Sequence, residues 1–242
     1  MTRGLRKAFR WRLPLWIRRG PGRLGGLAFL SCPLAFLIPL EGMGLVGTRV
    51  QGISVVVWFL GLSLPLSVRA VSGLRDPMSV WTYQKGCGMG DTALEDWILD
   101  MGLFAGFALL WALAGVAALA LTQAVGLGNI LSLWLLGTSV ALLTHSLTFF
   151  LSAAGASRPS DPVAFLAFTS ILIPVLMVKA PDWMASLAHW GIPPYHASMA
   201  ISGAIRAGNF SEAAGSLLHV LVYSGLALGL GARSISRWKP IT

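Results

Sequence analysis

Apolar stretches alternate with short polar connections along this chain, and six of them are long enough to cross a bilayer. A crossing helix needs roughly 20 residues, and every backbone N–H and C=O must bond within the segment because the lipid core holds no water. The pattern predicts an all-α integral membrane protein with one six-span membrane domain, residues 24–242, after a basic segment, residues 1–23. The predicted spans lie near 24–44, 50–68, 98–121, 127–151, 162–179 and 214–232.

The basic residues are distributed unevenly between these spans. Fifteen of the 18 Lys and Arg residues fall on alternate connections, on the same side as both chain ends. The positive-inside rule therefore predicts a multi-pass protein of the cell inner (cytoplasmic) membrane with both termini in the cytoplasm. The net charge of +9 flanks membrane spans, which favours contact with anionic lipid and argues against nucleic-acid binding.

The first 23 residues predict a basic helix that lies in the membrane interface. This helix either serves only as a topology anchor or also contacts a partner protein. Its apolar positions are Leu5, Phe9, Leu13 and Trp16, and Arg6 and Arg10 are among the basic residues on its other faces.

The connection between the second and third spans predicts a short cytoplasmic helix. Asp76 can cap it, Pro77 suits its first position, and Gly86 ends it after Lys85. A helix of about nine residues is unstable alone in water, so we expect it to dock on another surface through its large side chains Met78, Trp81 and Tyr83. Further on, Thr92 to Glu95 fits a capping box that starts the next helix.

Three ionisable residues are candidates for a polar role within or near the membrane. Glu95 and Asp100 occupy the first turns of the third predicted helix, where they are either solvated or interfacial acids or groups with a gating or partner-binding role. His145 falls inside the fourth span near Thr144 and Thr148. It is either a hydrogen-bonded histidine between helices or a catalytic or proton-carrying one.

The outer segment 180–213 is too apolar for an ordinary solvated loop. Its prolines and aromatic residues predict short broken helices that dip into the interface, a re-entrant region before the last span. These residues are Pro181, Trp183, Trp190, Pro193, Pro194 and Tyr195.

Known catalytic and nucleotide-binding patterns are missing from the sequence. It contains no HExxH, no GxSxG and no mid-span pair of carboxylates, and none of its lysines stands in GxxxxGK[ST]. We expect no catalytic residue, metal or cofactor in this chain, and any ATP-driven activity would need a separate subunit.

The C-terminal half resembles the ABC-2 type permeases, the membrane subunits of a large class of ABC exporters. The resemblance lies in a proline-aromatic segment, a proline followed by tyrosine, a helix with an arginine, and a last span that closes on basic residues. It covers roughly the last 80 residues and is carried by Ile173-Pro174, by Ala180 to Met184, by Ile192 to Ala197, by Ala204 to Asn209 and by Ala232 to Arg237.

The resemblance implies a transport subunit without its own nucleotide site, and not an enzyme. Its partners would be an ABC ATPase subunit, which binds ATP and Mg, a second permease subunit in a homo- or heterodimer, and membrane lipids. By position, Asp76 to Gly86 would be the coupling helix. The implied ATPase contacts are Asp76, Pro77, Met78, Trp81, Tyr83, Lys85, Arg6 and Arg10.

Because the bundle is so apolar, a lipid-like or amphipathic exported substrate is favoured, with polysaccharide and peptide left open. Two alternatives remain at this level. One is a polytopic membrane enzyme acting on lipid, with His145 and the acids near Asp100 as its polar centre. The other is a structural subunit of a membrane complex.

Overall fold

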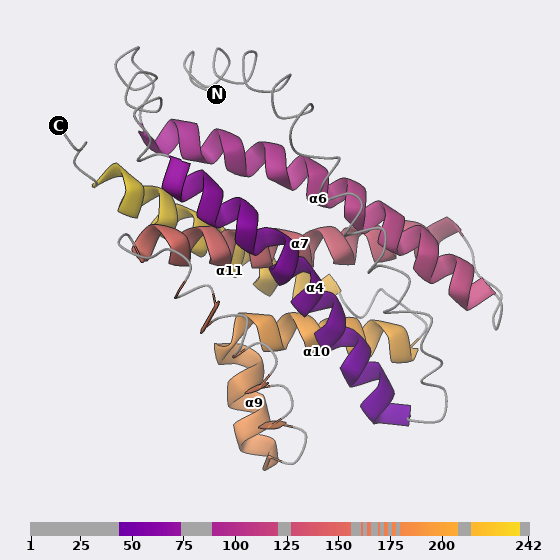
Figure 1. Ribbon diagram of the computed structural model, residues 1–242. Helices are drawn as coiled ribbons and strands as arrows, with labels where there is room; N and C mark the ends of the chain where they lie inside the picture. The colour runs from indigo at the N-terminus through magenta and orange to yellow at the C-terminus, as the bar shows by residue number, and fades with distance from the viewer. Residues whose placement is uncertain are drawn as a thin grey trace.

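The computed structural model describes residues 44–73, 89–120, 127–155, 180–207 and 214–237, together with single positions between 161 and 177. These ranges are helical and contain no strand, which confirms the all-α class for this part of the chain (Figure 1). The helices are α4 (Gly44–Gly73), α6 (Met89–Ala120), α7 (Leu127–Ala154), α9 (Asp182–Gly191), α10 (Pro193–Ala207) and α11 (Ala214–Ser236).

Three helices are long and apolar enough to cross a membrane. They fall on the third, fourth and sixth predicted spans, so the membrane character of the chain is confirmed at these places. The spanning stretches are Ala93–Leu113 in α6, Ile130–Ala154 in α7 and Leu217–Ser236 in α11.

The other three predicted spans have different outcomes. The second coincides with the apolar stretch Gly52–Val68 of α4, which is shorter than the three spanning stretches. The first, 24–44, except for Gly44, and most of the fifth, 162–179, lie outside the described residues. The six-span layout therefore stays a prediction.

Helix α7 is the centre of the bundle, since α4, α6 and α11 all pack along it (Figure 1). The Trp134 indole Nε1 donates a hydrogen bond to the Ala105 carbonyl of α6 over 2.9 Å. At Gly137 a Cβ atom would lie 2.8 Å from the Trp111 ring, so glycine allows the close approach of α6 and α7. The core of this region is built from the large apolar side chains Phe59, Leu60, Phe104, Trp111, Leu133, Leu136 and Leu143.

A second, smaller core joins four helix ends at one end of the bundle. It contains Val71 from the end of α4, Trp97 from the start of α6, Phe149 near the end of α7 and Ile235 from the end of α11. Helices α4, α7 and α11 therefore finish where α6 begins (Figure 1). The predicted topology requires the same arrangement, because adjacent spans cross the membrane in opposite directions.

The spanning helices expose large apolar side chains on their outer faces. An exposed apolar surface of this extent is costly in water and is ordinary against lipid. The exposed residues include Leu109, Leu110 and Leu113 of α6, Leu131 and Leu135 of α7, and Leu218, Leu221, Val222, Leu226 and Leu230 of α11.

Helix α6 begins earlier than the capping box predicted. It starts at Met89, three residues before Thr92, so the interpretation of Thr92 as the helix cap is wrong. Ala93 and Trp97 are buried in the smaller core, and this tertiary packing stabilises the first turns, which local cap preferences would not have favoured.

Two short helices, α9 and α10, occupy the segment before the last span, as predicted, while their dip into the interface as a re-entrant region stays a prediction. Pro181 precedes α9 and Pro193 is the first residue of α10, where its fixed φ suits a helix start. Ile192 between them is extended, with φ −122° and ψ 97°, and so separates the two axes. Helix α10 packs against α4, while α9 projects away from the bundle (Figure 1).

Candidate functional site

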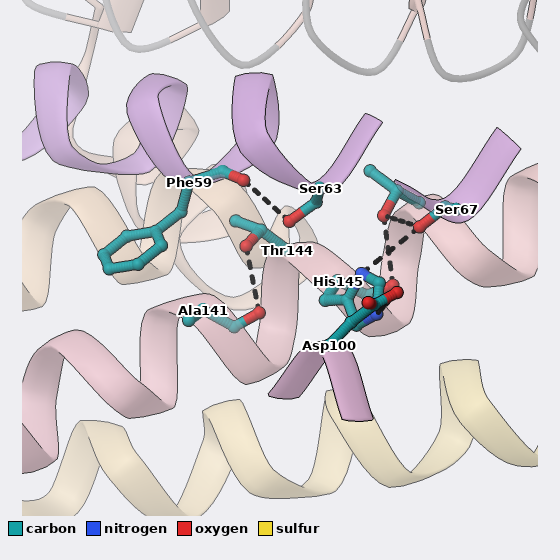
Figure 2. Close-up of polar contacts among 8 residues, drawn as sticks. Phe59, Ser63, Ser67, Asp100, Ala141, Thr144 and His145 are labelled. Atoms are coloured by element: carbon teal, nitrogen blue, oxygen red, sulfur yellow. Dashed lines mark hydrogen bonds and ion pairs between the residues drawn. The ribbon is translucent and has the colours of Figure 1, made fainter. Parts of the chain in front are cut away.

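Four polar side chains meet where α4, α6 and α7 pack together, and we refer to them as the buried polar cluster. Ser67 comes from α4, Asp100 from α6 and His145 from α7 (Figure 2). Thr148 is a further residue of α7. Their exposed fractions are 0%, 4%, 1% and 0%, respectively. Polar groups enclosed in this way are costly unless they bond to one another, so their contacts define the site.

His145 is the hub of the cluster. Its Nδ1 lies 3.3 Å from the Ser67 Oγ, and the Ser67 Oγ lies 2.7 Å from the Thr148 Oγ1. On the other side of the ring, Nε2 lies 3.8 Å from the Asp100 Oδ2. The Thr148 hydroxyl also donates to the His145 carbonyl over 3.0 Å. The imidazole thus connects a hydroxyl pair on one side with a carboxyl group on the other.

Two aromatic rings of α6 enclose the imidazole. The Trp97 indole stacks on it, with ring centroids 5.8 Å apart and an angle of 9° between the planes. The Phe104 ring meets it edge-on, with centroids 5.0 Å apart. Trp97, Asp100 and Phe104 are spaced three and four residues apart, so one face of α6 supplies both rings and the carboxyl group.

The contacts allow two proton arrangements. While the Thr148 hydroxyl donates to the His145 carbonyl, Ser67 donates to Thr148 and accepts from Nδ1–H. Nε2 of a neutral imidazole then presents a lone pair toward Oδ2, so the pair is favourable only with a proton on one of these two atoms. If Thr148 turns its hydroxyl to Ser67, Ser67 donates to Nδ1 and Nε2–H faces Asp100. The contacts of the cluster are therefore compatible with either tautomer of the neutral imidazole.

The described residues decide two of the open questions about ionisable groups. Glu95 and Asp100 are 0% and 4% exposed, so the interpretation of these two as solvated acids is wrong, while an interfacial, gating or partner-binding role stays a hypothesis. Neighbouring helices cover α6 at these two positions. The pattern of polar and apolar residues along α6 does not reveal this coverage. His145 is confirmed as a hydrogen-bonded histidine between helices. Its catalytic or proton-carrying role stays a hypothesis.

A second group of ionisable side chains lies where α9, α10 and α11 meet, and we refer to it as the histidine trio. It consists of His189 of α9, His196 of α10 and His219 of α11. The ring centroids of His189 and His196 are 4.3 Å apart, and those of His196 and His219 are 5.2 Å apart. Burial, followed by the nearby His196 and His219, lowers the pKa of His189.

Sequence reasoning missed Ser67, Trp97 and the proximity of the three histidines. The only sequence signal for Ser67 was its polar side chain inside a predicted apolar span, the same signal that identified His145. In the described part of the chain, no three His, Cys, Asp or Glu residues are arranged to hold a metal ion.

The predicted ATPase contacts cannot be placed with these clusters, because all of them lie outside the described residues. They are Asp76, Pro77, Met78, Trp81, Tyr83, Lys85, Arg6 and Arg10.

No family model, curated protein or solved structure matches the chain. Its class is therefore defined by its own features. Spanning apolar helices, outward apolar faces and enclosed polar residues make it a helical membrane protein.

Proposed function

We propose that this chain is the membrane-spanning permease subunit of an ATP-driven ABC-2 type exporter. The observation that carries the proposal is the pair of short helices α9 and α10 directly before the last span. Helix α9 begins in the Ala180 to Met184 segment and α10 in the Ile192 to Ala197 segment, both of which carry the family resemblance, and α10 packs against both α4 and α11. A proline-separated helix pair at this place is the most specific structural feature that the resemblance implies.

The packing suggests how a push from a cytoplasmic ATPase would reach the bundle. The proposed coupling segment, 76–86, connects the end of α4 with the start of α6. Val71 and Trp97 at these ends share the smaller core, and Ser67 and Asp100 lie about one turn further in. A displacement of the segment would therefore act on the two helices that hold opposite sides of the His145 ring.

ATP would supply the energy by binding better to the closed state of two partner ATPase subunits. Two permease subunits, identical or different, would form the path between them. A lipid-like or amphipathic cargo suits this chain best, since its outer faces are apolar and its polar groups are enclosed. Export of a polysaccharide or a peptide would refute this choice of cargo without refuting the permease assignment.

The test is purification from native membranes in mild detergent. We expect a protein with a GxxxxGK[ST] motif to co-purify, and ATPase activity to need both chains. Trp81→Ala combined with Tyr83→Ala should lower the yield of that partner at least about tenfold, as expected when interface anchors are truncated. Trp183→Ala, an exposed change on α9, is the matched control and should keep the yield. An unchanged yield in the double variant, or full activity of the chain alone, would refute the proposal.

A membrane enzyme acting on lipid is the second candidate, and the buried polar cluster favours it. With Ser67 donating to Nδ1 and Nε2–H facing Asp100, the three residues resemble a nucleophile, base and orienting acid. The Ser67 Oγ would attack an ester carbonyl carbon while Nδ1 takes its proton and later delivers it to the leaving alcohol. Water would then hydrolyse the acyl-Ser67 ester. Because Ser67 is fully buried, the bundle would have to open first.

A fluorophosphonate probe separates the two candidates. An enzyme of this kind should be labelled in the wild type and not in the Ser67→Ala variant, while Ser63→Ala, one turn away, should still be labelled. Absence of labelling in native membranes would refute the enzyme candidate and leave the permease proposal in place.

A further inference from the structure

Helix α9 is attached to the rest of the structure mainly through its last turn. Ala188 is its one buried residue, while Trp183, Met184 and Leu187 are exposed. The last turn, in contrast, makes several specific contacts. The Tyr223 hydroxyl of α11 donates to the Trp190 carbonyl.

Aromatic and imidazole rings make up the rest of this attachment. The Trp190 ring meets the His219 ring edge-on, with centroids 4.6 Å apart, and His189 lies against His196. His196 Nδ1 lies 3.1 Å from the His189 carbonyl. Because a carbonyl only accepts, Nδ1 carries the proton in this bond, and a neutral His196 has its lone pair on Nε2.

Few other charged side chains that the structure describes stand on the helices around the trio. On the described parts of α4, α7, α9, α10 and α11 the one carboxylate is Asp182, seven residues and about 10 Å from His189 along α9. Asp91, Glu95, Asp96 and Asp100 stand on the first turns of α6, at the opposite end of the bundle, and Asp161 belongs to none of the helices around the trio. Arg233, near the end of α11, is about 20 Å from His219 along that helix. Among titratable groups, Tyr195 packs against His189, and Tyr223 bonds to Trp190.

We propose that the histidine trio is an acid-sensitive clamp, which holds α9 against α10 and α11 while its imidazoles are neutral and releases α9 when they are protonated. Protons on two of the three imidazoles place like charges on rings whose centroids are 4.3 to 5.2 Å apart. Repulsion then separates the three helices at the point where they meet.

The direction of the pH dependence follows from His189. Its pKa is lowered by burial, and also by His196 and His219, so the released state binds more protons than the clamped state. The clamp is fully stable above the ordinary histidine pKa of about 6.5 and weakens as pH falls below it. For each proton taken up on release, the ratio of clamped to released molecules falls about tenfold per pH unit.

The clamp requires only these three helices and is independent of the proposed transport. The clamp responds to the pH of the compartment that faces this end of the bundle. If the permease assignment is correct, release of α9 would change access at that end. If it is wrong, the pH response remains.

The test measures the distance between α9 and α11 in the full chain, reconstituted in lipid nanodiscs. Cys32 and Cys87 are first replaced by serine, and spin labels are placed at Leu187→Cys and Leu226→Cys, both exposed positions. We expect a narrow distance distribution at about pH 8 and a longer, broader one at about pH 5, which brackets the histidine range. The change should reverse when the pH is restored.

Charge-free variants decide whether the trio is responsible. The triple change His189→Gln, His196→Gln and His219→Gln should abolish the response, and His189→Gln alone, which tolerates substitution better because His189 is only half-buried, should reduce its steepness. Asp182→Asn is the matched control on the same helix and should keep the full response. The clamp is refuted by a distance that does not change with pH, or by a response that persists in His189→Gln at full steepness.

Discussion

The Trp97 indole of α6 lies nearly parallel to the His145 imidazole of α7, at 9° and with ring centroids 5.8 Å apart. The contact covers one face of the histidine while Ser67 and Asp100 approach its two nitrogens. Trp97 also belongs to the smaller core with Val71 and Ile235. One side chain thus links the polar cluster to the end of the bundle where four helices meet.

Replacing Trp97 should destabilise the protein. Trp97→Ala removes a buried ring from the smaller core and opens one face of His145, so we expect a loss of about 3–5 kcal/mol in unfolding free energy. Trp97→Phe keeps an aromatic face and should lose clearly less. Unfolding in mixed micelles measures both. Trp183→Ala, whose ring is 68% exposed, is the control and should leave the transition in place.

The hydrogen bond between Ser67 and His145 should appear as energetic coupling. In a double-mutant cycle with Ser67→Ala and His145→Ala, we expect an interaction of about 0.5–1.5 kcal/mol. Ser63 is an ideal comparison, because it is equally buried in α4 but donates to the Phe59 carbonyl of its own helix (Figure 2). A cycle between Ser63→Ala and His145→Ala should give nearly zero. Equal coupling in both cycles would contradict the contact.

A methyl group at Gly52 should force α4 and α10 apart. Its Cβ would lie 2.2 Å from the Ser198 carbonyl oxygen and 2.4 Å from the Ser202 Oγ, and the first of these is backbone that cannot turn away. We expect Gly52→Ala to lower the melting temperature by several degrees, an overpacking cost of about 1–3 kcal/mol. Gly61→Ala on the same helix meets nothing within 4 Å and should be neutral or slightly stabilising. Equal melting temperatures would show that the helices do not approach in this way.

The orientation in the membrane can be tested with single cysteines on a background without Cys32 and Cys87. Ser236→Cys marks the end where α4, α7 and α11 finish, and Leu187→Cys marks α9; both positions are exposed. The distribution of basic residues predicts that an impermeant thiol reagent reaches Ser236→Cys only from the cytoplasmic side and Leu187→Cys only from the other side. Labelling from the reversed sides would invert the topology and place the proposed coupling segment on the exterior.

The sequence by itself determined the membrane class and the approximate position of four helices. A long apolar segment in lipid satisfies its backbone hydrogen bonds by forming a helix, and such segments predicted α4, α6, α7 and α11. The prolines at positions 181 and 193 likewise anticipated the break between α9 and α10, because a proline ring restricts its own backbone. Such local effects depend on neighbouring residues and can be read in order along the chain.

Only the tertiary structure decided which residues meet. Ser67 and His145 are 78 positions apart, and the three histidines belong to three helices, so no local pattern specifies their contacts. The early start of α6 and the burial of Glu95 and Asp100 depend on the same cause. Each results from packing between helices, and packing selects neighbours by shape and polarity over the whole bundle and not by spacing along one helix.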